Sequence, residues 1–317
     1  MSRDVDAVIV VAGEALVDIV LDRDGGLTGH PGGGPYNVAR TIGRMGQPVA
    51  FLGPLSTDAF GVRLRRELEA DGVRLEAVVP TDAPTTVALA EIVESGAADY
   101  RFYSAETSAP GLTLEAATAV LPSHVASFCF GTLGLVFEPM ATVLEVIVDR
   151  LDRDTLVALD PNCRPTTIRD PTAYRRRLER LLRRSDVIKA SDDDLAWLSP
   201  GTPPADAARA LLAQHGAVAL VTLGGEGALV VTRTEVIKVE APRVDVADTI
   251  GAGDAFMGAF LAHWHAQGLG RSELTRHREV VDAARLAVRV AADTCSRAGA
   301  DPPHRADLDS WSIHSGQ

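Results

Sequence analysis

Residues 248–260 read DTIGAGDAFMGAF, so that a glycine-rich turn leads directly into an apolar, helix-like run. The first N–H groups of a helix have no partner within the helix, and the helix dipole adds positive charge at that end. Glycine allows an anion to approach the backbone closely. This stretch therefore predicts a cradle for a phosphate group at the start of a buried helix.

Asp254 stands inside this predicted cradle, where a negative charge opposes the simple binding of an anion. The carboxylate has a clear purpose if it removes a proton from a hydroxyl group that then attacks a phosphoryl group. Taken alone, the turn is equally well explained by an Asp that caps an ordinary buried helix. The rest of the sequence must decide between these two interpretations.

The composition favours one large α/β domain or two small ones, since the chain has 317 residues, of which 46% are apolar. The formal net charge is −12, which argues against a nucleic-acid partner or an anionic membrane surface. The Arg-rich run at 174–184 is the exception. Its spacing predicts a solvated helix whose buried face carries Leu178, Leu181 and Leu182.

The three cysteines, Cys129, Cys163 and Cys295, are far apart and form no CxxC pair. Such usage predicts a reducing compartment and neither a disulfide framework nor a zinc site. The first 20 residues lack the basic start of a signal peptide, and no stretch approaches the ~20 apolar residues that span a bilayer. We therefore expect a cytoplasmic protein.

Short apolar runs alternate with helical patterns along most of the chain, which predicts a mostly parallel sheet with helices on both faces. Strands are predicted at 6–13, 49–55, 126–131, 155–160, 186–191 and 217–224, and helices at 35–46, 58–71, 138–152, 170–184 and 203–215. Ligands of such sheets bind at the carboxyl ends of the strands.

Two segments depart from this alternation. Residues 14–29 contain an Asp-Gly-Gly turn between alternating side chains, which predicts a hairpin. Residues 85–104 alternate in the same way, turn at Ser95-Gly96 and return. We expect a single domain over 1–317, in which segments of about 14–31 and 84–105 form a small β-layer that acts as a lid.

The segment VTLGGEGALV, residues 221–230, predicts a hairpin whose glycines can lie against a nucleotide. The chain contains no GxxxxGK[ST] motif, which excludes a P-loop enzyme. No GxGxxG follows the first predicted strand with an acidic residue about 20 positions later. A dinucleotide oxidoreductase is therefore disfavoured.

DTIGAGDAFMGAF resembles the C-terminal signature of the ribokinase-like (PfkB) carbohydrate kinases, and GGGPYNVARTIGRMG (32–46) resembles their N-terminal signature. Other segments that resemble family landmarks follow in order: GEALVDIV near the start, then 53–61, 128–135, 160–165, 189–195 and VTLGGEGA. The resemblance covers nearly the whole chain. It implies a three-layer α/β/α sandwich with a β-lid, and an ATP-dependent kinase that acts on a sugar.

The resemblance also implies roles for individual residues. Asp254 matches the catalytic base, and Gly251, Ala252 and Gly253 with the backbone of Asp254 match the anion hole. Positions matched to sugar binding are Asp18, Gly33, Gly34, Asn37, Tyr103 and Arg164; those matched to the nucleotide are Lys189, Thr222, Gly224, Gly227, Gly251 and Gly253; and those matched to a monovalent cation are Asp248, Ile250 and Gly299.

The chain departs from the family pattern in two places. Many members carry N-x-x-E in a loop that organises magnesium and phosphate, and here Ser191 and Asp194 occupy those positions. A carboxylate on a shorter arm still suits hydrated Mg²⁺, so we expect Asp194 to act through water. Pro303 occupies a late cation-site position, which argues against a strong dependence on K⁺.

Pro35, residues 102–104 and the segments around 132 and 162 most resemble the fructokinase branch, which implies a primary hydroxyl of a fructose-like ketose as the acceptor. Kinases of 2-keto-3-deoxygluconate share D-P-N-x-R, and there Arg164, helped by Arg101, would pair with a substrate carboxylate. Tyr36 and Tyr103 either line the pocket or simply pack.

The open alternatives are therefore a kinase of such a keto-deoxy acid, another sugar or nucleoside kinase of this family, and a non-catalytic sugar-binding regulator. An exposed β-layer also seeks a partner, so the lid predicts a possible homodimer.

Overall fold

The computed structural model describes residues 7–21, 25–92, 98–214 and 216–308. Its main sheet has nine strands in the order β13 (Val236–Val239), β12 (Ala228–Val231), β11 (Val218–Thr222), β10 (Val187–Ser191), β9 (Leu156–Asp160), β8 (Val125–Gly131), β1 (Val8–Ala12), β4 (Val49–Ser56) and β5 (Val78–Thr81). The strands from β11 to β5 run parallel, whereas β12 and β13 are antiparallel.

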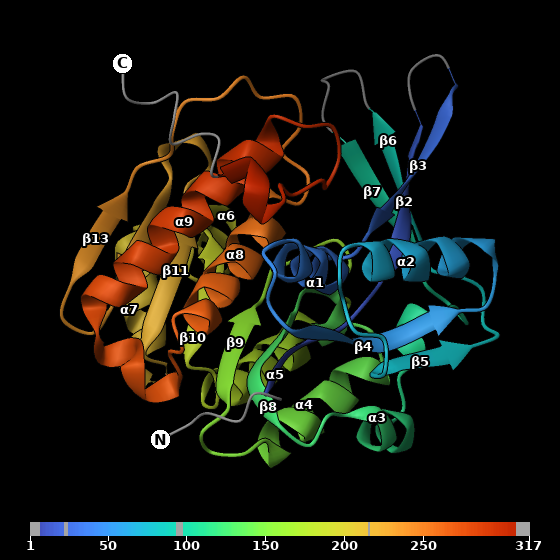
Figure 1. The fold of residues 1–317 in the computed structure, drawn as a ribbon, viewed down its shortest axis with the longest axis horizontal. Coiled ribbons are helices and arrows are strands. Elements are labelled where there is room, and N and C mark those ends of the chain that lie inside the picture. Colours follow the sequence, from blue (N-terminus) through green and yellow to red (C-terminus); the bar gives the residue numbers. More distant parts are fainter. Residues whose placement is uncertain (1–6, 22–24, 93–97, 215, 309–317) are drawn as a thin grey trace.

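Helices cover both faces of this sheet, which confirms the predicted α/β class with three layers (Figure 1). One face packs against α1 (Gly34–Arg44), α2 (Ala59–Ala70), α8 (Ala252–Ala266) and α9 (His277–Cys295). The other packs against α3 (Leu114–Val120), α4 (Met140–Arg150), α5 (Pro171–Leu182), α6 (Asp192–Leu198) and α7 (Pro204–Gln214).

The two cores explain the continuous apolar runs in the sequence. In β1, Ile9 and Val11 belong to the core under α8, while Val10 and Ala12 belong to the core on the opposite face. A strand that is buried on both faces has no polar side to alternate with. The runs therefore predicted parallel strands correctly.

A second sheet has the strand order β3 (Leu27–Gly32), β2 (Leu16–Leu21), β6 (Val87–Ile92) and β7 (Ala98–Tyr103), and projects beside the main sheet (Figure 1). Strands β2 and β3 form an antiparallel hairpin, as do β6 and β7, and the two hairpins join through the parallel pair β2–β6. Both predicted hairpins are present, although the turn at Ser95-Gly96 and the Asp of the predicted Asp-Gly-Gly turn lie outside the described residues. That this sheet acts as a lid remains a prediction.

The five predicted helical segments correspond to α1, α2, α4, α5 and α7, with ends displaced by a few residues. In α5, Leu178, Leu181 and Leu182 are buried as predicted, and Arg180 is exposed and pairs with Glu145 of α4. Helices α3, α6 and α9 and strands β5 and β13 lie where no element was predicted.

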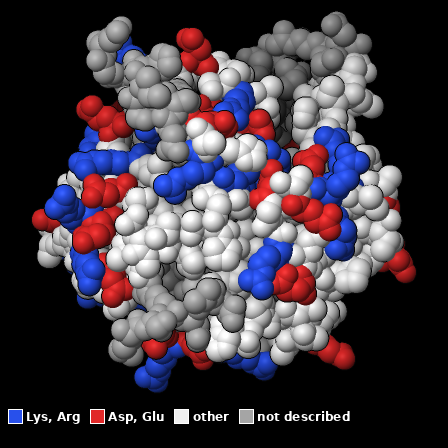
Figure 2. Space-filling model, viewed as in Figure 1, with Lys and Arg blue, Asp and Glu red and all other residues white. Residues whose placement is uncertain are grey.

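Basic and acidic side chains are interspersed on the face of the molecule shown in Figure 2. Over the described part of the chain, no helix combines the length and apolarity required to cross a membrane.

Candidate active site

Helix α8 begins in the predicted phosphate cradle. Gly251, at its N-terminal cap, has a left-handed backbone with φ of 76°. The N–H of Ala252 donates to the carbonyl of Thr249 at 3.3 Å, so Ala252 is less available than the sequence suggested. For the N–H groups of Gly251, Gly253 and Asp254, no acceptor is found among the described residues. Three of the four predicted donors therefore remain open.

Asp254 lies in the first turn of α8 and is only 8% exposed. Burial raises its pKa from 3.8 to about 7, although the hydrogen bond from Asn37 and the charge of Lys189 act in the opposite direction. A carboxylate with a pKa near neutrality is well suited to accept a proton and to release it again. The geometry thus places a buried carboxylate in the same helix turn as open N–H donors.

Residues of the segment 32–46, which resembles the N-terminal family signature, contact Asp254. Asn37 of α1 donates from Nδ2 to Oδ2 of Asp254 at 2.9 Å. The Oδ1 atom of Asn37 is buried and has no partner among the described residues. A Cβ added to Gly34 would lie 3.3 Å from Oδ1 of Asp254, and Gly33 has a positive φ of 107°. Gly34 and Asn37 therefore lie at the predicted base, whereas Gly33 lies against the backbone of Glu14 and Ala15.

A small cavity of about 10 Å³, enough for about one water molecule, lies between these elements. Gly34, Thr132, Asp160 and Asp254 line it together with Cys129 and Phe130. Register pairs Gly131 with Asp160 and Ser191 with Thr222, so the carboxyl ends of β8 to β11 share one edge. The cavity lies at this edge, where the ligands of parallel sheets bind.

Glu14 was not predicted as a site residue, yet it joins two loops of the cavity. Its carboxylate accepts hydrogen bonds from the hydroxyl of Thr132, from Gly34 N–H at 3.3 Å and from Gly134 N–H at 3.0 Å. Burial raises the pKa of Glu14 to about 7. Thr132 has a φ of 53°, uncommon for a β-branched residue. The only sequence signal for a role of Glu14 was its position as a single acidic residue beside a predicted apolar strand.

Lys189 and Asp160 form a buried ion pair below the start of α8. The distance from Nζ to Oδ2 is 2.7 Å, and both side chains are at most 5% exposed. Burial alone would lower the pKa of Lys189, but the charge of Asp160 raises it above its ordinary value. A Cβ added to Gly253 would lie 2.8 Å from Nζ. Lys189, predicted to contact the nucleotide, is thus enclosed directly behind the cradle.

Asp18 of β2 and Arg164 interact electrostatically at the border of the small sheet. Burial raises the pKa of Asp18 to about 6, and the positive charge of Arg164 opposes this shift. Arg164 itself is exposed. The carboxylate lies against Gly32, where an added Cβ would approach Oδ2 within 2.0 Å. The two side chains therefore lie close enough for their charges to interact, and their contact with a sugar remains a prediction.

The tyrosines of the predicted pocket behave differently. Tyr36 is fully buried in the core, where its ring meets Phe51 edge-on and its hydroxyl donates to the carbonyl of Leu64. Simple packing is therefore the correct alternative for Tyr36. Tyr103 is 52% exposed near the end of β7, and Arg101 on the same strand is also exposed.

The predicted nucleotide residues Thr222, Gly224 and Gly227 lie at the turn from β11 to β12. Gly224 and Gly227 have φ values of 53° and 95°. A Cβ at Gly227 would approach the carbonyl oxygen of Val239 within 2.0 Å, so packing against β13 already requires glycine there. Their contact with a nucleotide remains a prediction.

Asp194, the predicted magnesium residue, is buried and forms a capping box at α6. Its Oδ2 accepts hydrogen bonds from the N–H and hydroxyl of Ser191 at 2.8 and 2.7 Å, and its Oδ1 accepts from Cys163 N–H at 2.6 Å. Among the described residues, no cluster of three or more His, Cys, Asp or Glu side chains could hold a metal ion. Both carboxylate oxygens of Asp194 thus accept hydrogen bonds within the protein, and its contact with Mg²⁺ through water remains a prediction.

The three predicted cation residues lie together. Asp248 accepts hydrogen bonds from Ile250 N–H at 3.0 Å and from Gly299 N–H at 2.9 Å. The carboxylate thus connects the turn before α8 to a segment 51 residues away. Whether an ion binds there remains a prediction.

Known proteins resemble this chain over most of its length. Residues 6–306 match the model of the "pfkB family carbohydrate kinase". A fructokinase of Rhizobium leguminosarum bv. trifolii is 36% identical over 264 residues, which cover 80% of this chain and 78% of the relative. The structure of fructokinase with bound ATP from Xylella fastidiosa has a TM-score of 0.88 and 26% identity, and covers 97% of this chain and 99% of that one.

A fructokinase double mutant from Vibrio cholerae, solved with fructose, ADP and a potassium ion, has a TM-score of 0.86 and 24% identity. The alignment covers 98% of this chain and 99% of that one. At this identity the likeness shows a common fold.

Proposed function

The chain belongs to the pfkB family of carbohydrate kinases, in its fructokinase-like branch, and we propose that it phosphorylates a primary hydroxyl of fructose or of a fructose-like ketose with ATP. One observation carries the proposal most: Asp254 is a buried carboxylate with a pKa of about 7, in a helix turn with open N–H groups. A kinase requires this combination, whereas a sugar-binding regulator has no use for the base.

In the proposed reaction, Asp254 removes the proton of the acceptor hydroxyl. The hydroxyl oxygen then attacks the γ-phosphorus in line, the bond to the β-phosphate oxygen breaks, and ADP leaves with that electron pair. Asn37 holds the base through Nδ2, and its free Oδ1 would accept a hydrogen bond from another sugar hydroxyl. The N–H groups of Gly251, Gly253 and Asp254 stabilise the charge on the transferred group.

The other predicted contacts would surround this centre. Asp18, Gly33, Gly34, Tyr103 and Arg164 would hold the sugar. Thr222, Gly224 and Gly227 would hold the nucleotide, with Lys189 adding positive charge behind the cradle.

Two cations would assist. Bound Mg²⁺ would neutralise phosphate charge, with Asp194 holding it through water. A monovalent cation such as K⁺ would be held by the loop of Asp248, Ile250 and Gly299.

The small sheet would close over the sugar and exclude water, because an open site would hydrolyse ATP wastefully. We also infer that the enzyme acts in the cytoplasm and that two copies pair through this sheet. A monomeric mass in solution would contradict the pairing.

The test of the acceptor is a panel of fructose, ribose, 2-keto-3-deoxygluconate and adenosine, in which sugar-dependent ADP release gives kcat/KM for each. We expect fructose to give the highest value. If 2-keto-3-deoxygluconate gives the highest kcat/KM, and Arg164→Met raises the KM for this acid but not that for fructose, the acid is the substrate. If no compound stimulates ADP release, the regulator becomes the better interpretation.

The rate should depend on pH in a direction set by Asp254. The base acts in its ionised form, and its pKa of about 7 means that the protonated form dominates below neutrality. We therefore expect log kcat/KM to fall with a slope near one as pH decreases through about 7. A profile that stays flat down to pH 5 would contradict the assignment.

Glu14 has a similar pKa and interacts with Asp254, so the two carboxyl groups are coupled. Glu14→Gln removes that second titration. Because the negative charge of Glu14 hinders ionisation of Asp254, the acid limb of this variant should remain and move to lower pH.

A further inference from the structure

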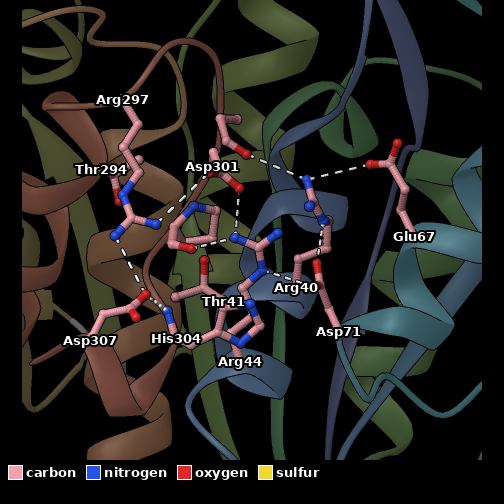
Figure 3. A network of polar contacts seen from close by, with 12 residues as sticks. Arg40, Thr41, Arg44, Glu67, Asp71, Thr294, Arg297, Asp301, His304 and Asp307 are labelled. Carbon is pink, nitrogen blue, oxygen red and sulfur yellow. Dashed lines mark hydrogen bonds and ion pairs between the residues drawn. The ribbon is translucent and has the colours of Figure 1, made fainter.

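One face of α1 carries an unusual set of polar side chains. Asn37, Arg40, Thr41 and Arg44 follow the spacing i, i+3, i+4 and i+7, which aligns them along one side of a helix. Asn37 reaches the base, as described above, and Thr41 packs against Gly258 of α8, where an added Cβ would lie 2.6 Å from the Cβ of Thr41. The two arginines instead point toward Asp71 and the segment 300–302 (Figure 3).

Arg44 is almost fully enclosed, with 10% of its side chain exposed, and it has three acceptors. Its Nε donates to Asp71 at 2.8 Å, while one terminal nitrogen donates to Asp301 at 2.6 Å and to the carbonyl of Pro302. Arg40 donates to the other oxygen of Asp71 at 2.6 Å and to the carbonyl of Ala300 at 3.4 Å. Both arginines therefore hold the segment 300–302 (Figure 3).

The segment 300–302 supports the catalytic turn. A Cβ added to Gly251 would lie only 2.5 Å from the Cβ of Ala300, so the two backbones are in close contact. The preceding residue, Gly299, donates its N–H to Asp248 at 2.9 Å. Since Gly251 caps α8, a displacement of 300–302 would also displace the open N–H groups at the start of this helix.

We propose that Arg44, assisted by Arg40, is a positioning residue that fixes the catalytic turn through the segment 300–302. The inference rests on the proposed kinase function. One rigid helix then sets both sides of the reaction, because α1 orients the base through Asn37 and the anion hole through Arg44. The planar guanidinium of arginine suits three acceptors at fixed angles, whereas the ammonium of lysine does not.

The position of the network supports a role in geometry. Removing two ion pairs from water costs free energy that their mutual attraction barely repays, so apolar packing would serve stability as well. The anion hole, in contrast, tolerates little error, since a shift of about 1 Å in reacting groups can cost about 100-fold in rate.

The experiment compares Arg44→Lys and Arg44→Met with Arg285→Met, which removes an exposed arginine that pairs with Asp282 within α9. We expect the Arg44 variants to lose about 10- to 100-fold in kcat. The KM values for sugar and ATP should change less than about threefold, because their binding residues stay in place. Arg285→Met should match the wild type.

Two further measurements separate positioning from general damage. Binding of ADP with aluminium fluoride and sugar, which imitates the transferred phosphoryl group, should weaken in parallel with kcat, while binding of ADP alone should not. If Arg44→Met does not fold, Asp301→Ala, at a side chain that is 47% exposed, should give the same pattern in weaker form.

The results also distinguish the two proposals. Folded Arg44 variants with wild-type kcat, or with equal losses in ADP binding and kcat, would overturn the positioning role alone. If both the wild type and Arg285→Met fail to phosphorylate every sugar tested, the kinase proposal itself falls, and the positioning role falls with it.

Discussion

Asp254→Asn is expected to lower kcat by about 10²- to 10⁴-fold, because general-base catalysis typically contributes a factor of this size. The amide has nearly the shape of the carboxylate, and its oxygen still accepts the hydrogen bond that Asn37 donates at 2.9 Å. Sugar binding should therefore survive, and the KM for sugar should remain within a few-fold of the wild type.

Stability separates this result from misfolding. Burial raises the pKa of Asp254, which means that its charged form is disfavoured in the folded protein. Removing the charge should leave the melting temperature unchanged or slightly higher. Asp282→Asn, a change at a side chain that is 43% exposed on α9, serves as the control. A fully active Asp254→Asn enzyme would show that another group takes the proton.

The residues that could be predicted from sequence are those whose chemistry is local. The turn at Gly251-Gly253 and the carboxylate behind it occupy consecutive positions, so their combination is visible without a fold. The strands could be predicted for a similar reason. Because β1 and its neighbours are buried on both faces, their sequences are continuous apolar runs.

The parts that could not be predicted depend on contacts between distant segments. Glu14 reaches Thr132 across 118 positions, and Arg44 reaches Asp301 across 257. The residues that flank Glu14 and Arg44 in the sequence do not indicate which distant residues they contact. The engagement of Ala252 N–H is also invisible, since it depends on how tightly the turn at Thr249 closes.

Lys189 and Asp160 could be predicted only in part. Each lies in a segment that the sequence identifies, but the ion pair between them is visible only in the structure. Lys189→Met leaves the buried carboxylate of Asp160 without its cation. We expect a loss of about 3–5 kcal/mol in the free energy of unfolding, measured with denaturant, and a similar loss for Asp160→Asn, which leaves the ammonium unpaired.

The double variant Lys189→Met/Asp160→Asn should recover most of this stability, because no unpaired charge remains buried. Losses that simply add in the double variant would mean that the two side chains act independently. Arg180→Met, which breaks an exposed pair with Glu145, should cost less than about 1 kcal/mol and sets the scale for a surface pair.

Activity should not recover with stability. The ammonium of Lys189 lies behind Gly253, so its loss removes positive charge from the place where phosphoryl charge develops, and kcat should stay about 10- to 100-fold below the wild type. Lys189 also lowers the pKa of Asp254, whereas Asp160 raises it. Asp160→Asn, measured at permissive temperature, should therefore move the acid limb of the rate to lower pH, and Lys189→Met should move it to higher pH. If both limbs move in the same direction, the charges of this pair do not set the pKa of the base.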